Sequence, residues 1–268
     1  MNKRLPVILL LCLLTLPIFA QEESAVDSTL GWTYPSLINV TVSQVSFSNW
    51  AAGGENSYSI NGLTVLGADR KGKKSIWEND LSLAYGVMKQ GENELRKTDD
   101  NIELSSKYGY KASKDWYYSG LLQFKSQFAE GFKYDDDAGT KTKLSEFMSP
   151  AYLNLSIGMT YQPSKVFSLF IGPISGRSTF VMDDTLSAAG AFGVEPGENI
   201  RNEFGGTLKA ELNKDIVKNV NMTTKLELFS NYAEKPGNVD WDWQFLLTMK
   251  VNKLLSANIN LHLIYDDD

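Results

Sequence analysis

Charged side chains recur at every second position in several stretches of this sequence, so each stretch carries its charges on one side of an extended chain. Such a face can line a polar interior. Across these stretches acidic and basic residues balance, whereas a selective pore usually shows a ring of one sign. The balance favours paired charges that fill a narrow interior. The candidate lumen-lining residues are Glu103, Lys107, Lys125, Arg201, Glu203, Lys209, Lys225, Glu227 and His262.

His262 is the only histidine of the chain, which limits imidazole catalysis to one position. A serine nucleophile needs a nearby base, most often histidine. Outer-membrane phospholipases carry a His-x-Ser pair, but residues 262–264 read His-Leu-Ile. Omptin-like proteases use an Asp-x-His pair, but residues 260–262 read Asn-Leu-His. We therefore expect no catalytic residues and no enzyme activity, with His262 as a polar residue of the interior.

The run Asp135, Asp136 and Asp137 is a candidate Ca²⁺ site, because carboxylate oxygens suit this ion. The run lacks the alternating ligand spacing and the terminal Glu of an EF-hand. A solvated loop is the simpler interpretation, and divalent bridging to lipopolysaccharide is the alternative. The single cysteine, Cys12, excludes an internal disulfide framework and a Cys-based zinc site. No cofactor is expected.

The chain has 268 residues, with 26 basic and 32 acidic side chains and a formal net charge of −6. An acidic chain lacks the basic footprint of a nucleic-acid-binding protein, so we expect no nucleic-acid partner. Residues 1–20 have the basic start and the apolar run that are typical of a secretory signal peptide. We predict cleavage before Gln21 and an N-terminal periplasmic segment over residues 21–37.

Apolar and polar residues alternate with period two along the rest of the chain, which is the pattern of β-strands. Most of these segments run to about ten residues. Strands of soluble sheets usually have about five or six, whereas a strand that crosses a bilayer needs roughly 9–11. The eleven predicted strands start near Ile38, Ser57, Ile76, Asn101, Trp116, Ala151, Lys165, Ile200, Asn219, Trp241 and Ser256.

Short turns and long loops alternate between these segments, as they do in outer-membrane barrels. Aromatic residues such as Trp116 and Tyr161 lie near predicted strand ends, where interfacial girdles form. Pro173 blurs the seventh segment. A change of phase between Val42 and Val45 blurs the first and predicts a bulge there. The predicted long loops are Lys89–Asp100, Glu130–Ser149, Met182–Asn199 and Tyr232–Asp240.

We therefore predict an all-β fold, an antiparallel up-and-down transmembrane β-barrel over residues 38–268. Bacterial single-chain barrels have an even number of strands, and an open edge in lipid leaves costly unpaired backbone groups. Eleven visible strands imply about twelve when complete, so we expect the closing strand to be missing from this sequence. Alternatively, one blurred segment is two strands or none. A soluble secreted β-sandwich shows the same alternation and is the second architecture considered.

Residues 48–57 resemble a motif of a known family. The residues that carry the resemblance are Asn49, Trp50, Gly53, Gly54 and Asn56, and residues 69–72, 77–79 and 263–268 extend it. In these features the sequence resembles the Bacteroidetes proteins grouped as domain of unknown function 3078. The resemblance implies an outer-membrane-type barrel of unassigned role and brings no catalytic residues with it.

Together these patterns predict a porin-like β-barrel of the cell outer membrane, with a small channel or transport role as the favoured function. A structural or lipid-handling barrel is the alternative, and an outer-membrane hydrolase is less favoured. The expected partners are outer-membrane lipid, lipopolysaccharide and a small solute.

Overall fold

The computed structural model describes residues 30–47, 53–252 and 255–266. The predicted signal peptide and two residues of the family-like motif, Asn49 and Trp50, lie outside these residues. No helix in the described part of the chain has the length and apolar character that a membrane span requires.

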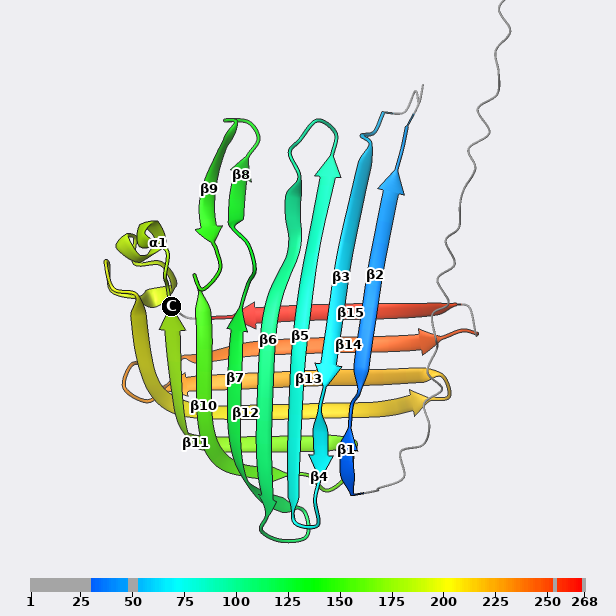
Figure 1. Cartoon of the computed structure of the whole chain (residues 1–268), viewed down its shortest axis with the longest axis vertical. Helices are drawn as coiled ribbons and strands as arrows, with labels where there is room; N and C mark the ends of the chain where they lie inside the picture. Colours follow the sequence, from blue (N-terminus) through cyan, green and yellow to red (C-terminus); the bar gives the residue numbers. More distant parts are fainter. Residues whose placement is uncertain (1–29, 48–52, 253–254, 267–268) are drawn as a thin grey trace, which may run out of the picture.

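Eleven long antiparallel strands follow one another through a single sheet (Figure 1). Each predicted segment corresponds to one of them, so the all-β, antiparallel up-and-down fold is confirmed. They are β2 (Ser36–Val45), β3 (Ser57–Gly67), β5 (Ser75–Gln90), β6 (Arg96–Lys111), β7 (Trp116–Ser126), β10 (Ala151–Tyr161), β11 (Phe167–Phe180), β12 (Ile200–Val217), β13 (Val220–Asn231), β14 (Val239–Lys250) and β15 (Ser256–Tyr265).

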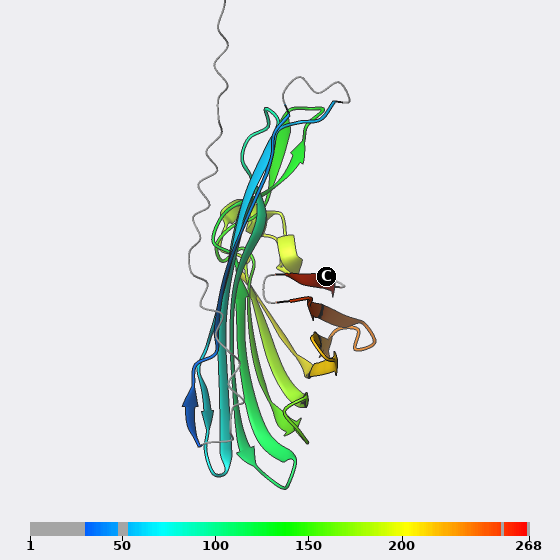
Figure 2. The same cartoon turned by 90° about the vertical axis from the view of Figure 1, so that its right-hand side faces the viewer.

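The sheet curves strongly, so that its C-terminal strands run across the concave side of the N-terminal strands (Figures 1 and 2). Strand twist accumulates over many neighbours and produces this barrel-like curvature. Among the described residues, β2 and β15 pair with their inner neighbours and not with each other. The sheet begins earlier than predicted, because β1 (Gly31–Thr33) pairs with β4 (Asp69–Lys71) beside β5.

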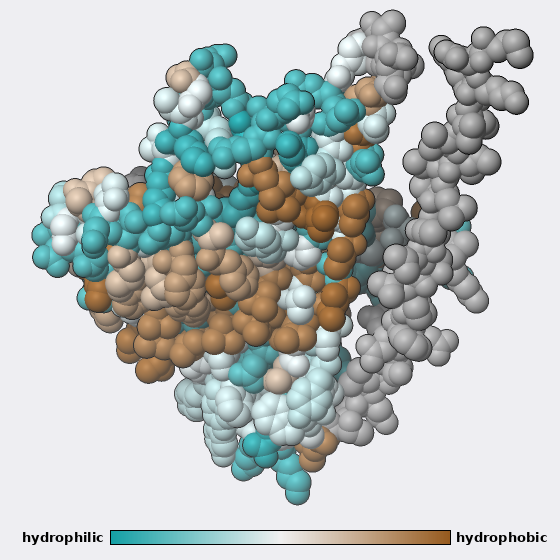
Figure 3. All heavy atoms as spheres, turned by 45° about the horizontal axis from the view of Figure 1, so that its top comes forward, coloured by the Kyte–Doolittle hydropathy of each residue, from teal (hydrophilic) through white to brown (hydrophobic). Residues whose placement is uncertain are grey.

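Side chains alternate between a concave inner face and a convex outer face. The outward Tyr118 and Ile157 are 62% and 66% exposed, whereas their chain neighbours Ser119 and Ser156 are buried. Figure 3 shows a band of apolar residues across the face that it presents, with hydrophilic residues gathered above it. Apolar residues thus face outward and polar residues inward, which is the reverse of a soluble core.

Three predicted connections contain more structure than expected. The Lys89–Asp100 loop is mostly strand, because β5 runs to Gln90 and β6 starts at Arg96. The Glu130–Ser149 loop holds a hairpin of β8 (Gly131–Asp135) and β9 (Thr140–Ser145). The Met182–Asn199 loop holds the helix α1 (Asp184–Ala188) and the 3-10 turn η1 (Ala191–Gly193).

The bulge predicted in the first segment is wrong. The pairing of β2 with β3 is continuous, and β2 ends at Val45, so the change of phase falls at the strand end. The irregularity of the seventh segment is a register shift of β11 against β12 between Gly172 and Ser175, which brackets Pro173. Proline cannot donate to the ladder, so the strand adapts around it.

One lysine joins the two structured loops. Lys143 of β9 lies 3.0 Å from Glu130 and 2.9 Å from Asp183, and it also pairs with Glu146. Asp183 in turn caps α1 by accepting a hydrogen bond from the Leu186 N–H at 2.8 Å. We call Lys143, Glu130, Glu146 and Asp183 the loop clasp.

Gly158 provides a test of the packing inside the sheet. A Cβ on this residue would overlap the backbone oxygen of Ile171 on the adjacent strand, whereas a Cβ on Gly120 meets nothing within 4 Å. We expect Gly158→Ala to destabilise the protein by about 1–3 kcal/mol, because backbone must move. Gly120→Ala should be neutral or stabilise by a few tenths. Urea unfolding in detergent micelles measures both, and equal effects would contradict this account.

The loop clasp should open in acid. The Lys143 ammonium and then the Leu186 N–H hold the pKa of Asp183 below its ordinary value of 3.8. A carboxyl whose folded pKa is lowered stabilises the contact above the unfolded pKa, and the contact is lost as pH falls through the folded pKa. We therefore expect an intact clasp at neutral pH and its release below about pH 4.

Spin labels on Ala138 and Ala189 can follow this release as a change in their distance. Asp183→Asn should show a weakened clasp already at neutral pH. Glu94→Gln is the control, because Glu94 is the exposed partner of Lys141, a residue of the same β8–β9 hairpin as Lys143. This variant should leave the pH-dependent change in distance as it is in the unmodified chain. A distance that does not depend on pH in the unmodified chain would overturn the assignment.

Candidate functional site

All nine predicted lumen-lining residues lie on the inner face of the sheet. Strand registers fix this placement, because residues directly opposite each other point to the same side. The opposed inner-face pairs are Glu103 with Lys125, Glu203 with Arg177, Lys209 with Glu227, Lys225 with Glu211, and His262 with Gln244. Lys107 is four residues from Glu103, and Arg201 is two residues from Glu203, so both share that face.

Lys125 makes the contact that crosses the concave space. Its Nζ on β7 lies 3.2 Å from Asp242 on β14 and 3.7 Å from Glu227 on β13. Gln123 of β7 also donates a hydrogen bond to Glu227 at 3.1 Å. These strands are not neighbours in the sheet, so the side chains meet across the lumen. We call Lys125, Glu227 and Asp242 the lumen bridge.

The lumen bridge extends to His262. Its Nε2 lies 2.9 Å from Oδ1 of Asp242. The sequence showed an amide, Asn260, where an omptin-like pair has its carboxylate, and the structure brings the carboxylate from β14 instead. The contact of this imidazole is therefore to a carboxylate of the neighbouring strand. The imidazole thus adds a third side chain to the contacts around Asp242.

A buried hydrogen-bonded layer lies beside the bridge. Asn154 Nδ2 donates to Gln123 Oε1 and to Thr207 Oγ1, both at 3.3 Å. Ser156 donates to Thr207 at 3.2 Å and accepts from Ser175 at 2.8 Å. Gln123, Ser156, Ser175 and Thr207 are all at most 3% exposed. These residues come from β7, β10, β11 and β12, so side chains fill the interior here.

Arg177 is the inner-face residue that sequence analysis missed. Its guanidinium binds Glu203 through Nε at 2.7 Å and Nη2 at 3.0 Å, and Asp240 through Nη1 at 2.6 Å. It also lies 4.1 Å above the ring of Phe229. Because the register of β11 shifts between Gly172 and Ser175, the period-two pattern of this segment did not show which way Arg177 points. The signal that could have found it is the inward-facing Glu203, which needs a cation opposite it on the neighbouring strand.

A second charged cluster lies toward the short-turn side. Lys107 pairs with Glu78 at 2.8 Å and donates to the Ser168 hydroxyl at 3.4 Å. Lys209 pairs with Glu211 at 3.2 Å. A cavity of about 150 Å³ lies among these groups and is lined by Asp69, Glu78, Asp80, Ser105, Lys107, Lys209 and Glu211.

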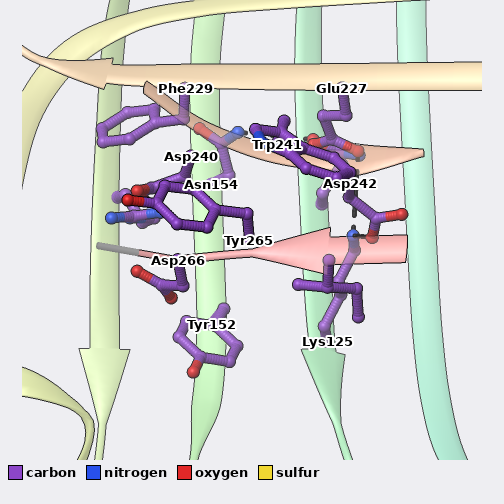
Figure 4. A pocket seen from close by; sticks show the side chains of 13 residues that line it. Lys125, Tyr152, Asn154, Glu227, Phe229, Asp240, Trp241, Asp242, Tyr265 and Asp266 are labelled. Atoms are coloured by element: carbon purple, nitrogen blue, oxygen red, sulfur yellow. Dashed lines mark hydrogen bonds and ion pairs between the residues drawn. The ribbon is translucent and has the colours of Figure 1, made fainter. Parts of the chain in front are cut away.

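The larger lumen cavity has a volume of about 270 Å³ and lies on the long-loop side (Figure 4). The lumen bridge forms one wall, and Arg177 with Asp240 forms another. Aromatic rings complete it, and Trp241 and Tyr265 stack with centroids 6.2 Å apart. We call this space the aromatic cavity. Its lining is Gln123, Lys125, Tyr152, Asn154, Arg177, Glu227, Phe229, Asp240, Trp241, Asp242, Ile264, Tyr265 and Asp266.

The three candidate Ca²⁺ ligands do not converge. Asp136 is bound by Arg96, whose Nη1 donates at 3.0 Å and whose pairing lowers the pKa of that carboxyl. Asp135 accepts a hydrogen bond from the Ala138 N–H at 3.0 Å. Within residues 30–47, 53–252 and 255–266, no group of three or more His, Cys, Asp or Glu side chains is arranged to hold a metal ion.

The described residues of the family-like motif have structural roles near the β2–β3 connection. Asn56 Oδ1 accepts a hydrogen bond from the Phe47 N–H at 2.7 Å. Gly54 has a φ of +127°, and a Cβ there would press on the Phe47 ring. Gly53 also has a positive φ, of +80°. Glycine adopts these angles without the steric cost of a side chain. The described part of the motif, Gly53, Gly54 and Asn56, thus shapes a loop.

The family model described as "Protein of unknown function (DUF3078)" matches residues 42–132. The resemblance is therefore confirmed over this segment, while the matching features at 263–268 lie beyond it. A search of the curated proteins finds no match. Among solved structures, the chain is similar to the translocator domain of the autotransporter NalP from Neisseria meningitidis. The two are 9% identical with a TM-score of 0.40, and 90% of this chain covers 85% of that one.

Arg177 should be the costliest inner-face cation to remove. Arg177→Met leaves Glu203 and Asp240, both largely buried, without their shared partner, and we expect a loss of about 3–5 kcal/mol. Arg201→Met is the control on the same carboxylate, because Arg201 contacts Glu203 through one nitrogen at 3.2 Å and reaches the exposed Glu234 at 3.9 Å. It should cost about 1 kcal/mol. Denaturant unfolding compares the two, and similar losses would refute the ranking.

Proposed function

We propose that this chain is an outer-membrane β-barrel that forms a narrow passage for a small solute, closed in the state described here. The lumen bridge is the single observation that carries the proposal. It joins β7 to β13 and β14 across the interior, so anything that moves through the lumen must separate Lys125 from its carboxylates. A passage with such a bridge conducts when the bridge opens.

The wall supports the membrane part of the proposal. The long strands from β3 to β14 pair with a neighbour on each side, which satisfies their backbone groups as hydrocarbon surroundings demand. Exposed apolar residues such as Ile157 and Ile174 face outward. Tyr108, Tyr110 and Tyr118 are also outward and lie toward one end of β6 and β7. Aromatic residues in this position suit the boundary between lipid and water.

We propose a transport-type role for the lumen and no catalytic one. Its polar groups are engaged with each other, as the contact of His262 with Asp242 illustrates. The proposed partners are outer-membrane lipid and lipopolysaccharide at the wall and a small solute in the lumen. We propose no nucleic-acid partner, because the chain is acidic.

Single-channel recording in a planar bilayer tests the closed passage. The unmodified protein should show rare openings of small conductance. Lys125→Met removes the ammonium that Glu227 and Asp242 share, and the repulsion between the two carboxylates should raise the open fraction at least about fivefold. Currents should also become more cation-selective, because two carboxylates then line the constriction.

Lys141→Met is the control for this recording, since Lys141 pairs with the exposed Glu94 and lies over the Phe132 ring, both away from the lumen bridge. It should leave the openings unchanged. A heat-dependent gel shift shows that each variant is folded. Silence from every folded and inserted variant would reject the passage and favour the structural or lipid-handling barrel.

A further inference from the structure

We infer that an outward-facing cluster at the short-turn end of the wall binds the phosphate group of an anionic phospholipid. The cluster consists of Arg70 and the rings of Trp32, Trp77 and Tyr108, and we call it the rim cluster. The inference names a lipid class and its place on the wall, and it rests on the proposed membrane setting. Three features carry it: one shared row on the outer face, a fixed indole ring, and cations separated from the nearby carboxylates.

Strand register places the rim cluster in one row across β1, β4, β5 and β6. Arg70 lies opposite Trp32 on one side and opposite Trp77 on the other. Trp77 in turn lies opposite the outward-facing Tyr108. Directly opposed residues point to the same side of a sheet, so all four side chains lie on the outer face. The short strands β1 and β4 lie beside the short-turn end of β5, near the lower edge of Figure 1.

The rings of the cluster lie against one another and beside the guanidinium. The ring centroids of Trp32 and Trp77 are 5.8 Å apart, and those of Trp77 and Tyr108 are 6.5 Å apart. The Arg70 guanidinium lies 6.0 Å from the centroid of the Trp32 ring. All three rings are exposed, and aromatic rings favour the head-group level of a membrane. A phospholipid can therefore place its phosphate at Arg70 and its glycerol and upper acyl chains against the rings.

Hydrogen bonds fix the Trp77 ring in this position. Its Nε1 donates to the Ser106 hydroxyl at 3.0 Å, and that hydroxyl donates to Asn79 Oδ1 at 2.7 Å. Asn79 Nδ2 donates to the backbone oxygen of Ala68 at 2.7 Å. The chain of bonds holds the ring before any lipid arrives, which lowers the cost of ordering the site on binding. Residues 69–72 and 77–79 of the family resemblance thus meet in one place.

The charges near the rim cluster are sorted between the two faces of the sheet. Arg70 is exposed on the outer face, and Lys73 and Lys74 are exposed in the turn that follows β4. The neighbouring carboxylates of Asp69 and Glu78 line the smaller cavity on the inner face, where Glu78 pairs with a lysine. A guanidinium matches a phosphate through two parallel hydrogen bonds, and basic residues at a membrane surface attract anionic lipid.

The position on the wall selects the kind of lipid. Short turns of outer-membrane barrels lie on the periplasmic side, so the lipid within reach is a phospholipid of that leaflet. A zwitterionic phospholipid also carries a phosphate, but its own ammonium group cancels the charge that three nearby cations attract. We therefore expect the rim cluster to prefer phosphatidylglycerol over phosphatidylcholine.

Native mass spectrometry of the folded protein tests this preference. The protein is released from detergent micelles that contain equimolar phosphatidylglycerol and phosphatidylcholine. The unmodified chain should retain phosphatidylglycerol at least about tenfold more often, and Arg70→Gln should reduce the preference about fivefold. Equal retention of the two lipids by the unmodified chain would overturn the inference. Retention of lipopolysaccharide in place of phosphatidylglycerol, when both are present in the micelles, would also overturn it.

Lys214→Gln is the matched control. Lys214 is also exposed at the short-turn end, and it lies opposite Met222, away from the rim cluster. Because it is five positions from the inward Lys209 on the same strand, it faces outward as Arg70 does. Lys214→Gln should change the lipid preference by less than about twofold. Similar losses in both variants would assign the effect to net charge and reject the cluster.

Flotation with vesicles of the same two lipids separates this inference from the proposed function. Protein that floats with the vesicles but shows no lipid preference rejects the rim cluster and leaves the membrane barrel standing. Protein that shows the heat-dependent gel shift but does not float rejects the membrane setting and the inference with it. Lipid retention does not depend on conduction. A preference for phosphatidylglycerol in protein that is silent in the bilayer would reject the passage and support the rim cluster.

Discussion

The ion pairs between Lys125 on β7 and the carboxylates of β13 and β14 exist only because the sheet curls back on itself. Strand twist supplies the curvature, and the cross-lumen contacts hold the two halves of the curve together. Charges brought out of water in this way are stable only when each finds partners. The balance of lysines and carboxylates on the inner face is therefore a requirement of the fold as well as a property of the lumen.

The outer face of the sheet carries exposed apolar side chains instead of paired charges. Side chains such as Tyr118 and Ile157 are exposed, while their chain neighbours Ser119 and Ser156 are buried. In water such a surface would drive association, whereas in the proposed membrane setting hydrocarbon tails would solvate it. On the inner face polar residues bond with each other, as the layer of Asn154, Ser156 and Thr207 does, and a few apolar side chains such as Phe170 are buried among them. The two faces of the sheet thus suit two different surroundings.

Charged contacts hold the loops on the long-loop side in place. The loop clasp ties the β8–β9 hairpin to the α1 loop, and Arg96 ties the same hairpin to β6 through Asp136. The aromatic cavity lies on this side, with Arg177 and Asp240 in its lining.

The sequence by itself determined the eleven strands and the face on which each charge lies, because a period of two leaves only two sides to choose between. It located Lys125, Glu227 and His262 on the inner face for that reason. It missed Arg177, since the β11 register shift changes the phase of the strand. Only the tertiary structure decided which charges meet. Contacts such as Lys125 with Asp242 join strands far apart in the chain, and their distance depends on curvature summed over every strand pair between them.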